Sequence, residues 1–172
     1  YTDGNYGSKI EVDAAGNVYS SGRFNGTSDF DLGAGTFNLT SNGGFDAYLL
    51  KMDTDGNFVW AKSWGGTGYD EAFSLSINTT EIFITGFYAN TVDFDPGAGT
   101  LNLTSSGSND IFVSRFDLDG NFGWASSIGG TGDDRGFGIA TNSAGNVHVS
   151  GFFNNTADFD PGVCTFNQTS AG

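Results

Sequence analysis

The feature that most constrains the fold of this 172-residue chain is an internal repeat. Residues 46–77, DAYLLKMDTDGNFVWAKSWGGTGYDEAFSLSI, align without gaps on residues 110–141, DIFVSRFDLDGNFGWASSIGGTGDDRGFGIAT, at an offset of 64 positions. Residues 143–160 match residues 14–31 in the same way, and the middle copy, 79–95, is one residue shorter in its turn. Repetition at a fixed period is the signature of tandem supersecondary units. The chain therefore holds about two and two-thirds copies of a unit of 64–65 residues.

Each unit contains four short apolar segments, separated by Gly, Asn, Asp, Ser and Thr, which is typical of β-strands joined by tight turns. Around the second copy these segments are residues 46–53, 58–64, 72–78 and 81–88. No segment keeps helical spacing beyond a few residues. Four strands a unit, repeated in tandem, predict an all-β protein built from β-propeller-type blades.

One of these strands alternates between bulky and small residues. Phe73, Leu75 and Ile77 occupy every second position, and Ala72, Ser74 and Ser76 occupy the alternate positions. Because successive side chains of a strand point to opposite faces, we expect one bulky face and one small face. A small face suits a place where backbones approach closely.

The charge and composition exclude several classes of function. The net charge is −14, from 20 acidic and 6 basic residues, so the basic surface that a nucleic-acid-binding protein needs is missing. An acidic membrane surface would repel such a chain, and no apolar run is long enough for a transmembrane helix. Aromatic residues make up 15% of the chain, which favours a folded protein. No signal peptide is visible and the chain begins at Tyr1, so we expect a processed product or an excerpt.

Two residues that often carry chemistry occur once each. Cys164 lies where the other copies have Gly35 and Gly99, so we expect a free thiol outside any disulfide framework. His148 occupies the place of Tyr19 and Phe83, and we expect it to be a packing residue. No Ser-His-Asp or Cys-His arrangement and no phosphate-binding loop is present, since GGTG lacks the Lys-Ser/Thr of a P-loop.

The phrases DTDGN (53–57) and DLDGN (117–121) have two interpretations. Acidic residues at alternate positions resemble a calcium loop, but the later glycine and distal glutamate of an EF-hand are missing. The equivalent turns at 13–17 and 142–146 keep Gly-Asn and lose the middle aspartate. The shared glycine indicates a hairpin loop with a positive φ, and this is the interpretation we favour over a metal site.

A paired-carboxylate phrase, DFDLG or DFDPG, occurs once in every copy. Its aspartates are the candidate metal ligands of the chain: Asp29, Asp31, Asp93, Asp95, Asp158 and Asp160. Asp95 precedes Pro96-Gly97, which suits a type II turn and accounts for that aspartate. We find no structural reason for Asp93 in the sequence. The alternation of residues 92–94 and 100–104 predicts an extra hairpin here.

Topology predicts further acidic groups near these aspartates. Strands of a blade alternate in direction, so the hairpin connection and the connection between successive blades emerge on the same face. The second connection carries Asp70 and Glu71, or Asp133 and Asp134. Such a face offers oxygen ligands for Ca²⁺, the one cofactor we consider, although a solvated acidic rim is the simpler expectation. Paired carboxylates also serve glycoside hydrolysis, but three copies of one pair argue against a single asymmetric catalytic site.

The chain resembles a known repeat family. The segments GFGIATNSAGNVHVSGFF (136–153) and DAYLLKMDTDGNFVWAKSWGGTGYDE (46–71) look like the bacterial SBBP-type β-propeller repeat and, more loosely, the NHL repeat. The resemblance covers nearly the whole chain. The DFDPG phrase is similar to a variant found in large secreted and surface proteins of Gram-negative bacteria. The family implies a propeller fold and an extracellular location, but not a specific function, because propellers host many unrelated tasks.

The NHL similarity also implies an order of strands, with 136–141 innermost, 146–151 second, 110–117 third and 122–128 outermost. The whole chain, 1–172, would then be a single repeat region. It would contain blades at 6–64 and 71–128, a half blade at 135–153 and a trailing inter-strand loop at 154–172. Closed propellers have four to eight blades, so about two and a half blades indicate an incomplete propeller or part of a larger assembly.

We therefore expect a non-catalytic β-propeller repeat segment of a secreted or cell-surface bacterial protein. It would act as a binding, adhesion or scaffold module, with a protein, a glycan or further copies of itself as partner. We expect no nucleic-acid partner and no membrane insertion. Two alternatives stay open. One is a self-assembling, calcium-stabilised unit of an extracellular filament or ring, and the other is a carbohydrate-active enzyme.

Overall fold

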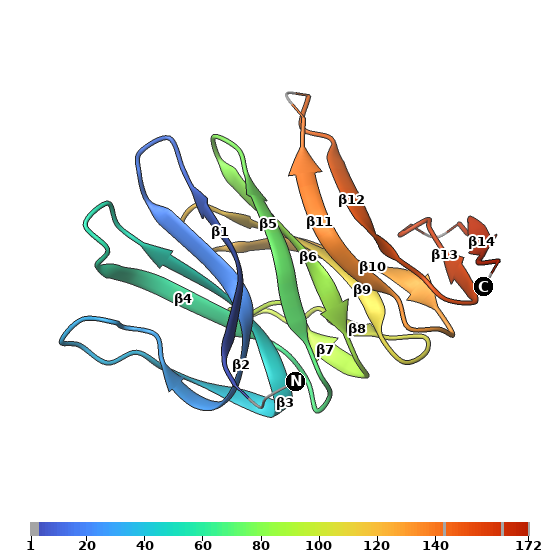
Figure 1. The fold of residues 1–172 in the computed structure, drawn as a ribbon, viewed down its shortest axis with the longest axis horizontal. Helices are drawn as coiled ribbons and strands as arrows, with labels where there is room; N and C mark the ends of the chain where they lie inside the picture. The colour runs from blue at the N-terminus through green and yellow to red at the C-terminus, as the bar shows by residue number, and fades with distance from the viewer. Residues whose placement is uncertain (1–3, 143, 163, 172) are drawn as a thin grey trace.

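The computed structural model describes residues 4–142, 144–162 and 164–171. Within these ranges the chain is all-β, built from antiparallel sheets. They contain no helix that could cross a membrane. Figure 1 shows the sheets following one another across the molecule, in sequence order, as blades of the β-propeller type.

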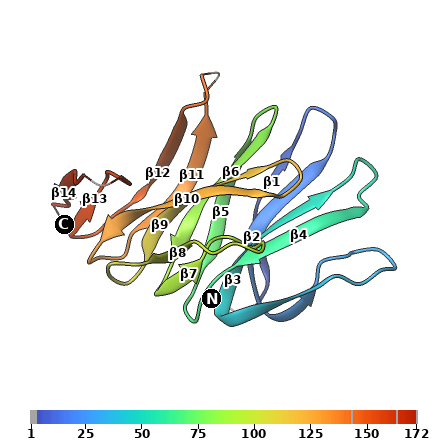
Figure 2. The same ribbon diagram turned by 180° about the vertical axis from the view of Figure 1, so that it is seen from behind.

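Three units follow one another along the chain, and the strand order is the one predicted. The first unit comprises, from the inside outward, β1 (Tyr6–Val12), β2 (Val18–Asp29), β3 (Asn38–Met52) and β4 (Phe58–Trp64). The second comprises β5 (Glu71–Ile77), β6 (Glu81–Tyr88), β9 (Asp110–Asp117) and β10 (Phe122–Gly130). As far as it is described, the third contributes β11 (Arg135–Thr141) and β12 (Val147–Phe152) as its inner strands, and these form a separate two-stranded sheet. The innermost strands β1, β5 and β11 lie side by side in both views (Figures 1 and 2).

The predicted extra hairpin is present in the second unit. It consists of β7 (Thr91–Asp93) and β8 (Asn102–Thr104), which pair with each other. The segment predicted as a trailing loop contains the same pair, β13 (Thr156–Asp158) and β14 (Asn167–Thr169). β13 also pairs with the end of β10, through Gly129 and Gly130. The hairpin of the third unit thus extends the sheet of the second, whereas β7 and β8 form a two-stranded sheet of their own.

The hairpin turns confirm the prediction for DTDGN and its equivalents. Gly16, Gly56, Gly120 and Gly145 all have positive φ, between 78° and 90°. The leading residue closes each turn. Asp53 accepts the main-chain N–H groups of Asp55 and Asn57 at 2.9 and 2.8 Å, and the Asn57 side chain donates to its other oxygen at 2.9 Å. These hydrogen bonds, chiefly those from Asn57, lower the pKa of Asp53.

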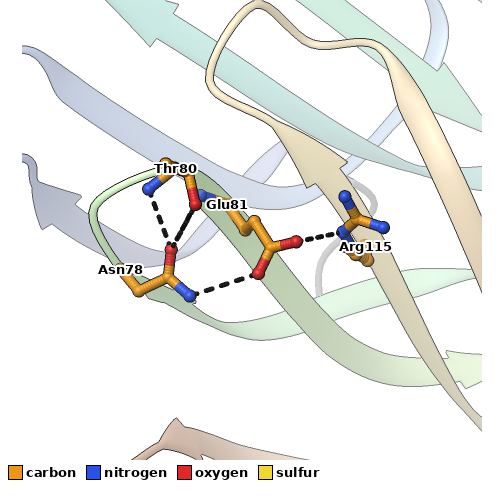
Figure 3. Close-up of polar contacts among 4 residues, drawn as sticks. All are labelled: Asn78, Thr80, Glu81 and Arg115. Atoms are coloured by element: carbon orange, nitrogen blue, oxygen red, sulfur yellow. Dashed lines mark hydrogen bonds and ion pairs between the residues drawn. The ribbon is translucent and has the colours of Figure 1, made fainter. Parts of the chain in front are cut away.

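In the shorter turn of the second unit, a side-chain amide in place of a carboxylate accepts the main-chain N–H groups of the turn (Figure 3). The Asn78 side-chain oxygen accepts the N–H groups of Thr80 and Glu81 at 2.9 and 2.8 Å. Asn78 also donates to Glu81 at 3.3 Å, and the other Glu81 oxygen lies 2.6 Å from Nε of Arg115 on β9. A side-chain acceptor that captures nearby N–H groups is what makes Asp and Asn favoured turn residues.

The larger buried cluster lies between the first two units, and a smaller one, which contains Phe24, Phe30, Leu50 and Ala61, lies within the first. Trp64, the last residue of the first unit, is 2% exposed, and its ring centroid lies 5.4 Å from that of Phe116 and 6.0 Å from that of Phe112 in the second unit. Tyr19 and Leu49 of the first unit belong to the same buried cluster. Each unit is therefore stabilised by the apolar face of its neighbour, as in other repeat proteins.

Candidate functional site

The first aspartate of each DFD phrase closes the extra hairpin. Asp93 Oδ1 accepts the main-chain N–H groups of Asp95 at 3.1 Å and Leu101 at 2.8 Å, which lie on the two arms of the hairpin. Asp29 and Asp158 make the same pair of bonds in their units. The prediction that Asp93 lacks a structural role is therefore wrong. Sequence spacing did not reveal it because the second bond spans eight residues.

The second aspartate of the phrase holds the tip of the hairpin. Asp95 Oδ1 accepts the N–H of Gly97 at 2.8 Å, and Asp31 and Asp160 make the equivalent bond. The predicted type II turn is wrong, because Gly97 does not have the positive φ which that turn requires. The hydrogen bond from the aspartate to the residue two positions later shapes the bend instead.

A metal site at these aspartates stays a prediction. In the described ranges no three Asp, Glu, His or Cys side chains are arranged to hold a metal ion. A Ca²⁺ ion takes six to eight oxygen ligands, whereas each hairpin brings together two carboxylates that already accept main-chain N–H groups. Calcium would have to use the remaining oxygen of each carboxylate together with main-chain carbonyls and water.

The connection between units lies beside the base of the hairpin, as predicted, but its aspartate is buried. Asp70 accepts the N–H of Gly66 at 2.8 Å and that of Ala89, just before the hairpin, at 2.9 Å. Asp134 makes the equivalent bonds to Gly130 and Asn154. Both aspartates are fully buried, so they fasten the connection to the hairpin and do not form an acidic rim.

A second aspartate is buried close to each of these. Asp46 and Asp110 are 1% and 2% exposed, and Oδ1 of each is buried without a hydrogen-bond partner. Burial raises the pKa of Asp46, Asp70 and Asp110 to about 6, and the charge of Asp70 adds to the effect on Asp46. Sequence reasoning aligned Asp46 with Asp110 without assigning them a role. The glycines of the GGTG loop were the sequence signal that could have revealed the buried aspartate. A Cβ on Gly65 would lie 2.3 Å from the Asp46 carboxyl carbon, so glycine leaves the space that the carboxylate occupies.

Of the other two predicted acidic groups, Glu71 lines a pocket at the start of the innermost strands, and Asp133 pairs with an arginine of the pocket wall. Glu71 pairs with Arg23 at 2.7 Å, and Asp133 pairs with Arg135 at 2.9 Å. The pocket has a volume of about 680 Å³ and includes residues from all three units. Its walls are Tyr6, Arg23, Tyr69, Glu71, Phe73, Phe87, Asn109, Arg135 and Phe137. This volume lies in the range of small-molecule and side-chain binding sites.

A β-bulge at the same place in each innermost strand shapes this pocket. The register shifts between Gly7 and Lys9, between Ala72 and Ser74, and between Gly136 and Gly138. The extra residues are therefore Ser8, Phe73 and Phe137. The expectation that Phe73 shares a face with Leu75 is wrong for this reason, since the Phe73 ring contacts Phe87 and Phe137 while Leu75 lies in the core. Bulges commonly turn a side chain toward a site.

Glycine on the neighbouring strand makes the bulge sterically feasible. A Cβ on Gly86 would lie 1.8 Å from the carbonyl oxygen of Glu71, and Gly22 and Gly151 are in the same situation. No larger residue fits where two backbones approach this closely. All three units keep this glycine, so they share the geometry of the pocket wall.

The charged groups of the pocket rest on aromatic rings. The Arg23 guanidinium carbon lies 4.8 Å from the ring centroid of Phe45 and 4.9 Å from that of Tyr69. The Arg135 guanidinium lies 4.5 Å from the Phe87 centroid. Such cation–π contacts fix the long arginine side chains and keep them extended along the apolar wall. The pocket thus offers apolar rings, guanidinium donors and carboxylate acceptors.

Two remaining predictions concern single residues. Cys164 is a free, exposed thiol, as expected. His148 is exposed, which corrects its interpretation as a packing residue. Its counterparts Tyr19 and Phe83 are buried, but β12 has no third strand beside it in the described part of the chain.

The fold defines the chain as a repeat protein of the β-propeller type. No protein-family model matches it. Across 62% of its length it is 29% identical to an uncharacterized WD repeat-containing protein of Acanthamoeba polyphaga mimivirus. It is equally similar, 29% across 62%, to the regulatory protein FlaEY of Caulobacter vibrioides. The chain spans only 9% and 11% of the length of these curated relatives.

Proposed function

We propose that this chain is a non-catalytic interaction module of a larger secreted or cell-surface protein, and that it anchors a partner protein in the pocket at the start of β1, β5 and β11. The extracellular location rests on the resemblance to SBBP-type repeats of secreted bacterial proteins. Similarity to a WD repeat-containing protein supports a propeller-like module, a class that serves many unrelated tasks. The observation that carries the proposal is the chemistry of the pocket wall.

Equivalent positions of the pocket carry unlike residues. The first residue of the innermost strand is Tyr6, Glu71 and Arg135 in the three units, and its partner on the second strand is Arg23, Phe87 and Phe152. The residue of the bulge is Ser8 in one unit and phenylalanine in the other two. An identical backbone thus presents an asymmetric surface, which one partner can recognise in one orientation.

A protein partner fits this surface better than a charged polymer. Both arginines of the pocket wall are neutralised by a carboxylate, Arg23 by Glu71 within the wall and Arg135 by Asp133 beside it, within a chain of net charge −14. Tyrosine and arginine are enriched among the residues that contribute most to protein interfaces, and apolar pockets there receive an anchoring side chain. Phe137 and Tyr6 are 50% and 61% exposed, so their rings are accessible to such an anchor.

The test uses a random peptide library displayed on phage and selected on the immobilised chain. We expect enriched peptides with an apolar anchor, and a loss of binding of at least about tenfold in the double variant Phe73→Ser/Phe137→Ser. The matched control is Leu32→Ser/Phe166→Ser, which removes two exposed apolar side chains outside the pocket. Peptides that bind both variants equally well, or a selection that enriches nothing while a glycan array gives ligands, would overturn the proposal.

A further inference from the structure

A second pocket lies between the outer strand of the second unit and the hairpin of the third. It has a volume of about 300 Å³. Residues of β10 form one wall, and the segments around β8 and at the end of β13 form the others. Three aspartates line it, Asp110, Asp158 and Asp160, and its described lining contains no lysine, arginine or histidine. We call it the acidic pocket.

Asp110 brings an unsatisfied oxygen to the acidic pocket. The residue is 2% exposed, and its Oδ2 accepts the main-chain N–H of Ser106 at 3.1 Å and the Ser127 hydroxyl at 3.4 Å. Its Oδ1 is buried without a hydrogen-bond partner. Ser106, Ser127 and Gly129 all line the pocket, and a Cβ on Gly129 would lie 2.8 Å from Oδ1. A buried acceptor without a donor is costly, so a ligand that donates here gains affinity.

The two aspartates of the third hairpin keep one oxygen each for a ligand. Oδ1 of Asp158 accepts the N–H groups of Asp160 at 3.0 Å and Phe166 at 2.7 Å. Oδ1 of Asp160 accepts the N–H of Gly162 at 2.8 Å. Among the described residues, none donates a hydrogen bond to Oδ2 of either aspartate. The acidic pocket therefore presents three carboxylates with one unpaired oxygen each.

Single oxygens on three carboxylates suit an ammonium group. A guanidinium pairs best with both oxygens of one carboxylate, whereas an ammonium is a compact charge with three donors. The described side chains do not form a metal-binding cluster. Leu103, Ala125 and Pro161 lie in the same lining, and the alkyl stem of a lysine-like ligand packs against such apolar groups. The volume is at the lower end of the range for ligand sites, which fits one side chain.

The comparison of units shows which residues are particular to this place. The residue equivalent to Ser126 by the 64-residue offset is Lys62, so the second unit has a hydroxyl where the first has an ammonium. The Tyr88 hydroxyl donates to Ser127 at 2.8 Å, and its equivalent Phe24 has no hydroxyl. The carboxylates themselves are kept, since their equivalents are Asp46, Asp93 and Asp95. The acidic pocket thus combines the aspartates of the repeat with a strand that has lost its cation.

We propose that the acidic pocket binds a primary ammonium on an alkyl stem, which is either a lysine side chain of a partner protein or a free alkylamine. The three N–H donors pair with the unpaired oxygens of Asp110, Asp158 and Asp160. The stem lies against Leu103 and Pro161. This site is separate from the pocket at the start of β1, β5 and β11, so it stands or falls independently of the proposed function.

The experiment titrates two probes into the isotope-labelled chain at neutral pH and follows the amide resonances of Ser126, Ser127 and Gly129 by NMR. The probes are n-butylamine and a lysine blocked at both ends. We expect both to shift these resonances, and tetramethylammonium, which has no N–H donor, to leave them unchanged. Tighter binding of the blocked lysine assigns the site to a partner protein, and tighter binding of butylamine assigns it to a free amine.

Matched variants test the carboxylates. Asp110→Asn keeps the shape of the side chain and should weaken binding of both probes at least about tenfold. Asp46→Asn, its equivalent outside the acidic pocket, is the control and should bind as the unchanged chain does. If Asp110→Asn does not fold, Asp160→Asn takes its place, with Asp31→Asn of the first hairpin as its control.

A gain of charge gives an independent readout. Ser126→Lys restores the residue of the first unit and should abolish the shifts caused by both probes. It should also unfold at a higher urea concentration than Ser126→Met, with a difference that shrinks in high salt. The proposal would be overturned by the absence of shifts with both probes, by equal shifts with tetramethylammonium, or by equal binding to Asp110→Asn and Asp46→Asn. Displacement of the amine by calcium chloride would also overturn it, in favour of a metal site.

Discussion

The hairpin connections and the pocket lie on equivalent strands of the same units, yet repetition has opposite consequences in the two regions. In the connections that lead into the second and third units, the same aspartate and glycines recur and make the same hydrogen bonds, as Asp70 and Asp134 do. In the pocket the backbone repeats, including the bulge, but the side chains do not. Repeated residues therefore mark architecture, and unlike residues on a repeated backbone mark the surface that is free to specialise.

The largest expected loss of stability is that of Gly86→Ala, which disrupts the close approach of two strands on which both regions depend. The new Cβ would lie 1.8 Å from the Glu71 carbonyl oxygen, so the two strands must separate. We expect a loss of about 3 kcal/mol or more in the free energy of unfolding, measured by urea denaturation. Gly7→Ala, on the strand opposite the equivalent glycine of the first unit, is the control. Its nearest atom is the Tyr48 hydroxyl at 3.3 Å, and an equally large loss there would show that the close approach is not the cause.

The next effect concerns the architectural aspartates. Asp70→Ala leaves the N–H groups of Gly66 and Ala89 without their acceptor in a buried place, and we expect a loss of about 2–4 kcal/mol in unfolding free energy. Asp95→Ala removes one exposed hydrogen bond and should cost less than about 1 kcal/mol. If the two variants unfold at the same urea concentration, Asp70 does not fasten the connection.

The buried aspartates also predict how stability depends on pH. The pKa of Asp46, Asp70 and Asp110 is about 6 in the folded protein and near 4 in the unfolded chain, so the folded state binds more protons between these values. Their contribution to stability is present at pH 4 and is lost as the pH rises to 6. Asp46→Asn should flatten this slope and raise the urea midpoint at pH 7, because it removes a buried charge. A steeper slope in Asp46→Asn would contradict the assignment.

The smallest expected effect on stability is in the pocket. Phe137 is 50% exposed, so Phe137→Ser should lower the unfolding free energy by only about 1 kcal/mol or less. Phe116→Ser, in the core between units, should cost about 3–5 kcal/mol by the same urea assay. A large loss for Phe137→Ser would place Phe137 among the architectural residues and would remove the contrast between the two regions.

The sequence predicted the elements that depend on local patterns, and missed those that depend on register. The positive φ of Gly56 and its equivalents and the extra hairpin follow from turn residues and alternation, and the strand order was implied by the resemblance to NHL repeats. The bulge at Phe73 shifts one residue against the neighbouring strand, and no alternation pattern reveals such a shift. The pocket depends on that bulge, so sequence reasoning found Glu71 as an acidic residue without finding its partner Arg23.

The role of Asp93 illustrates a second limit. Its hydrogen bond to Leu101 joins residues eight positions apart, so it appears only when the hairpin is closed. The carboxylate pair resembled a set of metal ligands because the sequence shows no hydrogen-bond donor for its oxygens. In the folded hairpin the donors are main-chain N–H groups, whose position depends on the fold and not on the type of side chain.

The pairing of β13 with β10 means that the covalent order of units and the boundaries of the sheets do not coincide. Residues 156–158 belong by sequence to the third unit, and by hydrogen bonding to the sheet of the second. Unfolding of either unit therefore breaks hydrogen bonds of the other. The interaction energy between neighbouring units is then large compared with the stability of a single unit. An array built in this way should lose its structure over several units in one cooperative step, and its mechanical resistance should reside in the overlaps between units.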